Sequence, residues 1–174
     1  MKRSLSLLSV IAFLLAFSSN AIAQTEVTAS ATIDATINAT VNSNVQFGSF
    51  SSSQNVDATI DPTGSNSNVG TGTVSNGNVH VQTSGGQGLS ISWSATDLTD
   101  GSGNTLTYNE TVYGNSSDTD DASSASELSS GDTATATSNG NYYIYVGGTI
   151  PGNSINGATG GSYDGNVTLT IATN

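Results

Sequence analysis

The most regular pattern in the chain is an alternation of apolar and polar residues from Val27 to Val41. Odd positions carry Val, Ala or Ile, and even positions carry Thr, Ser, Asp or Asn. Such alternation predicts a β-strand with one apolar face. At about 3.3 Å per residue the strand would be about 50 Å long, whereas strands in globular sheets are typically about 17–20 Å long. We therefore predict an overlong N-terminal strand that either bends between two sheets or leaves its own domain to pair elsewhere.

Shorter alternating blocks follow, separated by clusters of Gly, Asn, Asp and Ser, and no stretch has a sustained helical repeat. This spacing predicts seven to nine strands in an all-β, antiparallel sandwich. The Val79/Val81 block and the Leu89/Ile91 block are expected to form a hairpin. Gly114 to Asp132 is expected to be an exposed loop. In the block around Tyr143, alternation predicts that Tyr143 and Tyr145 face the core and that Tyr142 faces outward.

The two basic residues of the chain lie at its start. Lys2 and Arg3 precede an apolar run from Leu5 to Phe17 and the triplet Ala21, Ile22, Ala23. A basic start, a short apolar run and an Ala-x-Ala triplet are typical of a secretory signal peptide. We predict a signal peptide over residues 1–23, an N-terminal extension over 24–36 and a sandwich domain over 37–174. The protein is therefore expected to be exported.

After residue 23 the chain has 13 acidic residues and no Lys or Arg, which gives a net charge of about −13. Phosphate backbones and anionic membranes attract proteins through Lys and Arg, so nucleic-acid binding and electrostatic membrane docking are not expected. The chain has no Cys, which excludes disulfides and thiolate metal sites. No second apolar span follows the signal, so we expect no direct membrane span. We also expect no bound cofactor.

The sequence does not suggest an enzyme. His80 lies between Val79 and Val81, where alternation places it on the outward face of a strand. Asp97 and Asp100 could in principle form a carboxylate pair, but they flank a Gly-rich turn, where Asp commonly caps backbone N–H groups. The acidic run of Asp118, Asp120 and Asp121 raises the alternative of a Ca²⁺ site, because Ca²⁺ prefers oxygen ligands. It lacks the EF-hand spacing, so a solvated acidic loop is the favoured interpretation.

Several short motifs together resemble a family of bacterial secreted domains of unknown function. They are the alternating Ala-Thr start, Phe47-Gly48, the predicted Val79/Val81 and Leu89/Ile91 hairpin, the Leu-x-x-Gly-x-Gly-x-x-Leu segment from Leu98 to Leu106, and three blocks near the end: VGGTIP at Val146–Pro151, GGSYDG at Gly160–Gly165 and VTLTI at Val167–Ile171. That family is in turn similar to the spore-coat-U-like pilin domain of archaic chaperone-usher fimbriae. The resemblance implies an immunoglobulin-like sandwich at the cell surface.

In those pilins an N-terminal extension of one subunit inserts as the missing strand of the next. The resemblance therefore implies a fimbrial subunit whose donor strand presents Val27, Ala29, Ala31 and Ile33. The acceptor groove would be edged by Val167, Leu169 and Ile171. Partners would be other copies of the chain, together with a periplasmic chaperone and an outer-membrane usher. The chain departs from the pilins in having no Cys and no aromatic residue near its C-terminus.

Three alternatives remain open at the level of sequence. Val27 to Val41 could be a bent edge strand of a self-complete sandwich. The protein could be a monomeric secreted sandwich that binds a surface glycan or calcium, with tyrosines such as Tyr142 stacking on sugar. A long alternating segment can also pair edge to edge in amyloid-type fibres.

Overall fold

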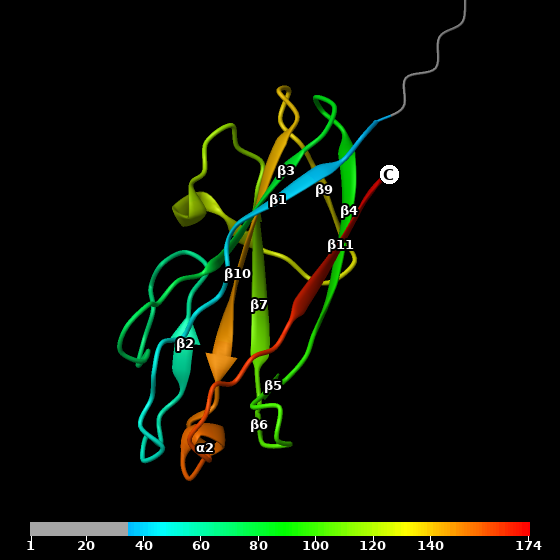
Figure 1. Ribbon diagram of the computed structural model, residues 1–174. Coiled ribbons are helices and arrows are strands. Elements are labelled where there is room, and N and C mark those ends of the chain that lie inside the picture. Colours follow the sequence, from blue (N-terminus) through cyan, green and yellow to red (C-terminus); the bar gives the residue numbers. More distant parts are fainter. Residues whose placement is uncertain (1–34) are drawn as a thin grey trace, which may run out of the picture. The chain divides into compact units, whose positions relative to one another are not determined.

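The computed structural model describes residues 35–174, and almost all of its regular structure is antiparallel β-sheet (Figure 1). A six-stranded sheet has the order β1-β3-β10-β7-β8, with β2 pairing the far end of β10, and a three-stranded sheet has the order β11-β4-β9. The strands of the larger sheet are β1 (Asn38–Ser43), β2 (Ala58–Ile60), β3 (Gly77–Gln82), β7 (Asn109–Asn115), β8 (Ser126–Glu127) and β10 (Asn141–Ile150). Those of the smaller sheet are β4 (Gly88–Ala95), β9 (Asp132–Thr135) and β11 (Val167–Thr173).

A separate two-stranded pair, β5 (Leu98–Thr99) and β6 (Thr105–Leu106), closes the Gly-rich turn. The helices are short: a 3₁₀ turn η1 (Ala122–Ser124) and a single-turn helix α2 (Gly152–Ile155). The described residues thus contain eleven strands, more than the seven to nine predicted, because three two-residue strands (β5, β6 and β8) are too short to show alternation. No helix within residues 35–174 has the length and apolar character needed to cross a membrane.

The two larger sheets share one hydrophobic core. Val79 and Val81 of β3 and Ile144 of β10 contribute from one sheet, and Leu89 and Ile91 of β4 contribute from the other. A second cluster lies at the other end of the domain, around Phe47, Ile60, Tyr108 and Ile150. Alternation along each strand places the strand residues of both clusters on its inner face, whereas Phe47 and Tyr108 come from loops.

The predicted hairpin of Val79/Val81 with Leu89/Ile91 is wrong. β3 pairs with β1 and β10, whereas β4 pairs with β11 and β9. The connection 83–87 therefore carries the chain from one sheet to the other. Both blocks alternate because each buries one face, and alternation does not reveal which strand is the neighbour.

The orientation predicted for the tyrosines of β10 is also wrong. Tyr142 pairs with Val81 and belongs to the core cluster, while Tyr143 pairs with His80 on the opposite face. Tyr143 and Tyr145 are nevertheless buried. Tyr143 and Tyr145 stack on each other, and the Tyr145 hydroxyl donates a hydrogen bond to Asp120 in the acidic segment. The acidic segment therefore covers the outward face of β10 at Tyr145.

The segment predicted as an exposed loop, Gly114 to Asp132, is only partly irregular. Gly114 and Asn115 end β7, η1 and β8 lie within it, and β9 begins at its last residue. The described part of the predicted N-terminal strand, residues 35–41, is in strand only from Asn38 onward. Residues 35–37 are not in strand, because the neighbouring strand β3 ends at Gln82, which pairs with Asn38.

Candidate functional site: a groove between two sheet edges

A groove of about 1280 Å³ runs between β1 and β11, the outermost strands of the two sheets. Its apolar lining comes from both edge strands and from the core residues between them. On one side lie Ala39 and Val41 of β1, and on the other lie Val167, Leu169 and Ile171 of β11. The three residues predicted from the sequence as the edge of an acceptor groove therefore line a groove.

The edge strands turn core-type side chains into this groove. Val41 pairs with Val79, and Ile171 pairs with Ile91, so each shares the inner face of its sheet with a buried neighbour. Val79 and Ile91 are buried, whereas Ile171 is half-buried and Val41 is 63% exposed. In the part of the chain that the structure describes, residues 35–174, both sheets therefore end at the groove with inner-face apolar groups that are only partly buried.

The backbone at the β11 edge is also open to pairing. Asn174 donates its N–H to the carbonyl of Gly88, and Thr96 donates its N–H to the carbonyl of Asn166. The backbone groups of the even-numbered residues of β11 therefore form the hydrogen bonds with β4. Because backbone groups in an antiparallel ladder point alternately to the two sides, those of Val167, Leu169 and Ile171 point away from β4. These same three residues turn their side chains into the groove.

The β1 edge follows the same rule. Thr83 donates its N–H to the carbonyl of Gly140, which fixes the odd residues of β3 as the ones that bond toward β10. The even residues of β3 then bond toward β1, and the backbone groups of Ala39 and Val41 point to the free side. The groove is therefore bordered by two strand edges that each offer apolar side chains and backbone hydrogen-bonding groups.

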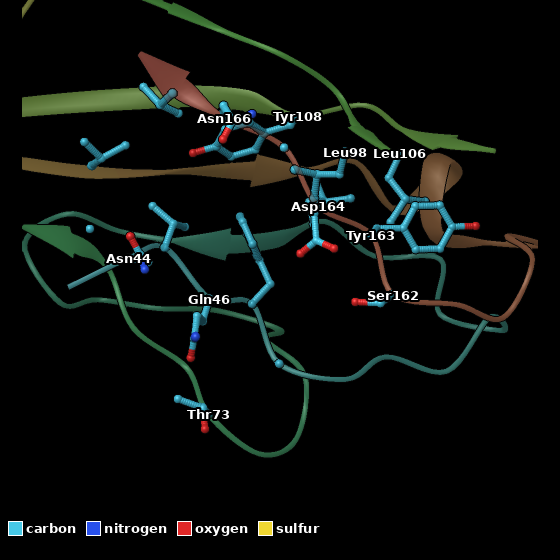
Figure 2. Close-up of a pocket in the computed structure, with 18 of the residues that line it drawn as sticks. Asn44, Gln46, Thr73, Leu98, Leu106, Tyr108, Ser162, Tyr163, Asp164 and Asn166 are labelled. Atoms are coloured by element: carbon cyan, nitrogen blue, oxygen red, sulfur yellow. The ribbon is translucent and has the colours of Figure 1, made fainter. Parts of the chain in front are cut away.

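A wider apolar region closes one end of the groove, where Leu98, Leu106, Tyr108 and Tyr163 meet. Figure 2 shows Leu98, Leu106 and Tyr163 gathered at this end, with the Asp164 carboxylate beside them pointing into the open space. Burial raises the pKa of Tyr108 above its ordinary value, and its hydroxyl donates a 2.6 Å hydrogen bond to the carbonyl of Gly147. No local pattern in the sequence predicts that these residues meet near the β1 edge, because they come from the short β5–β6 pair and from two separate loops.

The directions in which β1 and β11 run along the groove can be stated relative to the connection 83–87. Asn38 pairs with Gln82 just before it, and Thr173 pairs with Leu89 just after it. β1 therefore starts at the end of the domain marked by this connection, and β11 finishes there. The two edge strands run in opposite directions, as Figure 1 shows.

The donor residues Val27, Ala29, Ala31 and Ile33 lie outside the described residues, as do the signal peptide and all of the extension except Ala35 and Thr36.

The three acidic residues considered for Ca²⁺ do not converge. Asp118 accepts hydrogen bonds from the side chains of Thr137, Asn139 and Asn141, and these lower the pKa of its carboxyl group. Asp120 instead accepts from Asn78 and Tyr145.

Asp121 caps η1 by accepting from Ser123 and Ser124, which lowers the pKa of its carboxyl group. Within residues 35–174 no three His, Cys, Asp or Glu side chains are grouped so as to hold a metal ion.

The remaining candidates have local structural partners. His80 lies on the outward face, as predicted, stacks on Tyr143 with ring centroids 4.5 Å apart, and shares a hydrogen bond with Asn141. Asp97 accepts from the N–H of Tyr108, and Asp100 from those of Ser102 and Asn104. These Asp contacts match the turn-capping interpretation.

Comparison with models of known protein families and with curated proteins finds no match for this chain. Membership of the secreted-domain family named above therefore stays a prediction, and the structure adds to it a mostly β fold with antiparallel sheets.

Proposed function

We propose that residues 37–174 form an immunoglobulin-like sandwich that lacks one strand, and that the protein is a structural subunit of surface fibres. In this proposal the groove between β1 and β11 receives residues 27–33 of a second copy. The observation that carries the proposal is that both edges of the groove combine uncovered inner-face side chains with free backbone groups. A single added strand would satisfy both at once.

The N-terminal extension has the properties such a strand needs. Val27, Ala29, Ala31 and Ile33 alternate with Thr28, Ser30 and Thr32, so one face is apolar and the other is hydroxylated. Seven residues span about 20 Å when extended, the usual length of a strand. Full burial of Val27 or Ile33 would contribute about 1.5–3 kcal/mol each, in addition to the backbone pairing.

The composition of the extension favours donation to another copy over return to the same domain. To enter its own groove the chain would have to reverse direction just before β1, which begins at Asn38. Tight reversals draw on Gly and Pro, and neither occurs between Gln24 and Phe47. The unbroken alternation instead suits an extended segment that leaves its own domain.

Exchange between copies also agrees with the charge. Copies carrying about −13 each repel one another, and with no Lys or Arg after residue 23 they cannot join through the usual ion pairs. Apolar burial and backbone pairing are the attractions that remain. Each subunit would donate one strand and accept one, which is a head-to-tail contact that generates an open filament.

The remaining partners follow from the proposed assembly. An open groove with two free strand edges invites aggregation, so a newly exported subunit needs a protein that covers the groove before exchange. A periplasmic chaperone and an outer-membrane usher would fill these roles, and the finished fibre would serve adhesion at the cell surface.

The proposal is tested by deleting residues 24–35 and comparing the product with the full chain by size exclusion and electron microscopy. We expect the full chain to form fibres of regularly spaced domains and the deletion variant to form none. Ala31→Asp places a charge on the apolar face of the donor and should also prevent assembly, whereas the matched control Thr32→Asp changes the outward face and should not. Normal fibres from the deletion variant would exclude strand exchange.

A further inference from the structure

If the groove receives residues 27–33 of another copy, the residues at its rim determine how that strand is aligned. We propose that the inserted strand runs antiparallel to β11 with Ile33 opposite Val167, Ala31 opposite Leu169 and Ala29 opposite Ile171. This alignment rests on the proposed strand exchange and extends it to the direction and register of the strand.

The direction follows from where the edge strands begin and end. β1 starts and β11 finishes at the end of the domain marked by the connection 83–87. A donor parallel to β11 would emerge at that same end, so donor and acceptor would meet through like ends. Two copies placed in this way complete each other and form a closed pair.

A donor antiparallel to β11 emerges at the opposite end, near Leu98 and Tyr163. The starting end of one copy then meets the far end of the next, and the acceptor's own extension remains free for a third copy. A filament therefore requires the antiparallel direction.

The register follows from side-chain size and from charge. Apolar donor residues must lie opposite Val167, Leu169 and Ile171, because these odd-numbered residues face the groove. In the proposed register the small Ala31 and Ala29 lie opposite the larger Leu169 and Ile171, and the larger Ile33 lies opposite Val167. Ile33 also comes next to the apolar end of the groove, where Val167 packs.

The two neighbouring registers are less favourable. A shift of two residues in one direction brings Asp34 of the donor beside Asp164, whose carboxylate lines the groove, and like charges placed opposite each other destabilise a sheet. A shift in the other direction places Ile33 opposite Leu169 and moves Val27 beyond Thr173, the last residue of β11. The proposed register avoids both and places Asp34 beside the neutral Asn166.

The outward faces of the strands also match in the proposed register. Thr32 lies opposite Thr168, and Ser30 lies opposite Thr170. Thr168 and Thr170 themselves pair with Ser94 and Ser92 of β4. The donor would therefore continue rows of hydroxyl side chains across the sheet, and cross-strand Thr–Thr and Thr–Ser pairs are favourable.

Cysteine cross-linking in the full chain tests the alignment directly, because the protein has no cysteine of its own. Since Val167, Leu169 and Ile171 offer their backbone groups to the donor, Thr32/Thr168 and Thr28/Ala172 become non-hydrogen-bonded pairs with Cα atoms about 4.5 Å apart. That separation lies within the range of a disulfide. The exposed Thr168 and Ala172 tolerate substitution without loss of core packing.

We expect fibres of the double variant Thr32→Cys/Thr168→Cys, after oxidation, to run as a covalent ladder on a non-reducing gel, and Thr28→Cys/Ala172→Cys to do the same. Thr32→Cys/Asn166→Cys reports the shifted register, and Thr28→Cys/Thr168→Cys reports the parallel direction; neither should give a ladder. A ladder from either of these two, or fibres in which no pair cross-links, would overturn the alignment but leave strand exchange standing. A disulfide formed within single monomers that make no fibres would overturn both.

Discussion

Val41 and Val79 lie directly opposite each other on the inner face of their sheet, yet Val79 is 8% exposed and Val41 is 63% exposed. The difference arises because Val79 has strands on both sides, while Val41 lies on the outermost strand beside the groove. Single exposed apolar residues are common on proteins, but this one continues a row of buried ones. Within the described residues this inner-face position is left exposed, which supports the proposed insertion of a further strand beside β1.

A charge placed inside the groove should abolish assembly. We predict that Leu169→Asp prevents fibre formation, because insertion of the donor would bury an unpaired carboxylate. Leu169 is only half-buried in the isolated domain, so the fold should persist. The control Thr170→Asp, next along β11 on the outward face, should still assemble. Fibre yield by electron microscopy and the circular dichroism of both variants provide the measurement, and abundant Leu169→Asp fibres would contradict the prediction.

A free donor peptide should stabilise the domain that lacks its extension. The domain used is residues 37–174, without the extension. We predict that a peptide of residues 25–36 raises its thermal unfolding temperature in a dose-dependent way. At a hundred times its Kd a ligand of the native state adds about 2.7 kcal/mol to the free energy of unfolding. The matched control is the same peptide carrying Ala29→Asp and Ala31→Asp. Equal shifts with both peptides would mean that the apolar face is not what binds.

Much of the inner face could be predicted from the sequence, because alternation records which side of a strand is buried. Val79, Val81, Leu89 and Ile91 were placed on inner faces, and all four belong to the core. Alternation does not show which strands pair with each other, so the predicted hairpin between β3 and β4 is wrong. Strand β9 was missed, since its inward residue, Ala134, is too small to mark a strand.

Only the β11 side of the groove could be predicted from the sequence. Val167, Leu169 and Ile171 form a short alternating block, which predicts a strand, and their place at a groove edge was an implication of the family resemblance. Val41 has the same pattern as any strand residue, and its place on the outermost of the described strands follows only from the order of strands in the sheet. The contribution of Tyr108 and Tyr163 depends on loops whose positions no local pattern determines.

The hydroxyl of Tyr108 should stabilise the apolar end of the groove. It donates to the carbonyl of Gly147 in a buried setting, so Tyr108→Phe removes this hydrogen bond. A typical intramolecular hydrogen bond contributes about 0.5–1.5 kcal/mol, and we predict a loss of this size in the free energy of unfolding by urea. The control Tyr163→Phe removes an exposed hydroxyl that donates to Thr159 and should change stability by less. Equal effects would contradict a role for burial.

Gly140 should tolerate a side chain less well than Gly101. Both have a positive φ, 83° and 73° respectively, so alanine at either position pays the left-handed conformational cost of about 1–2 kcal/mol. A Cβ at Gly101 would meet open space, whereas one at Gly140 would collide with the carbonyl oxygen of Thr83. We predict that Gly140→Ala lowers the free energy of unfolding clearly more than Gly101→Ala, as measured by urea titration. Similar losses would show that the turn at Gly140 relaxes to make room.

The Asp118 carboxylate should make the stability of the domain sensitive to acid. Hydrogen bonds from Thr137, Asn141 and Asn139 hold its pKa below the ordinary value in the folded chain. A group whose pKa is lowered by folding stabilises the native state above its unfolded pKa, near 4, and loses that contribution as the pH falls through the lowered value. Asp118→Asn should therefore flatten the decline of stability below about pH 4, although Asp100 and Asp121, whose pKa values are also lowered, keep part of it.

Urea unfolding at a series of pH values from 7 down to 2 measures this effect. The matched control is Asp164→Asn, because the Asp164 side chain accepts no hydrogen bond from any residue in the described range 35–174. If both variants decline as steeply as the parent chain, the hydrogen bonds to Asp118 do not stabilise its ionised form. A flattening confined to Asp118→Asn would show that the acidic segment is held to the turn at Asn139 by its charge, since protonation removes the charge that these three donors stabilise.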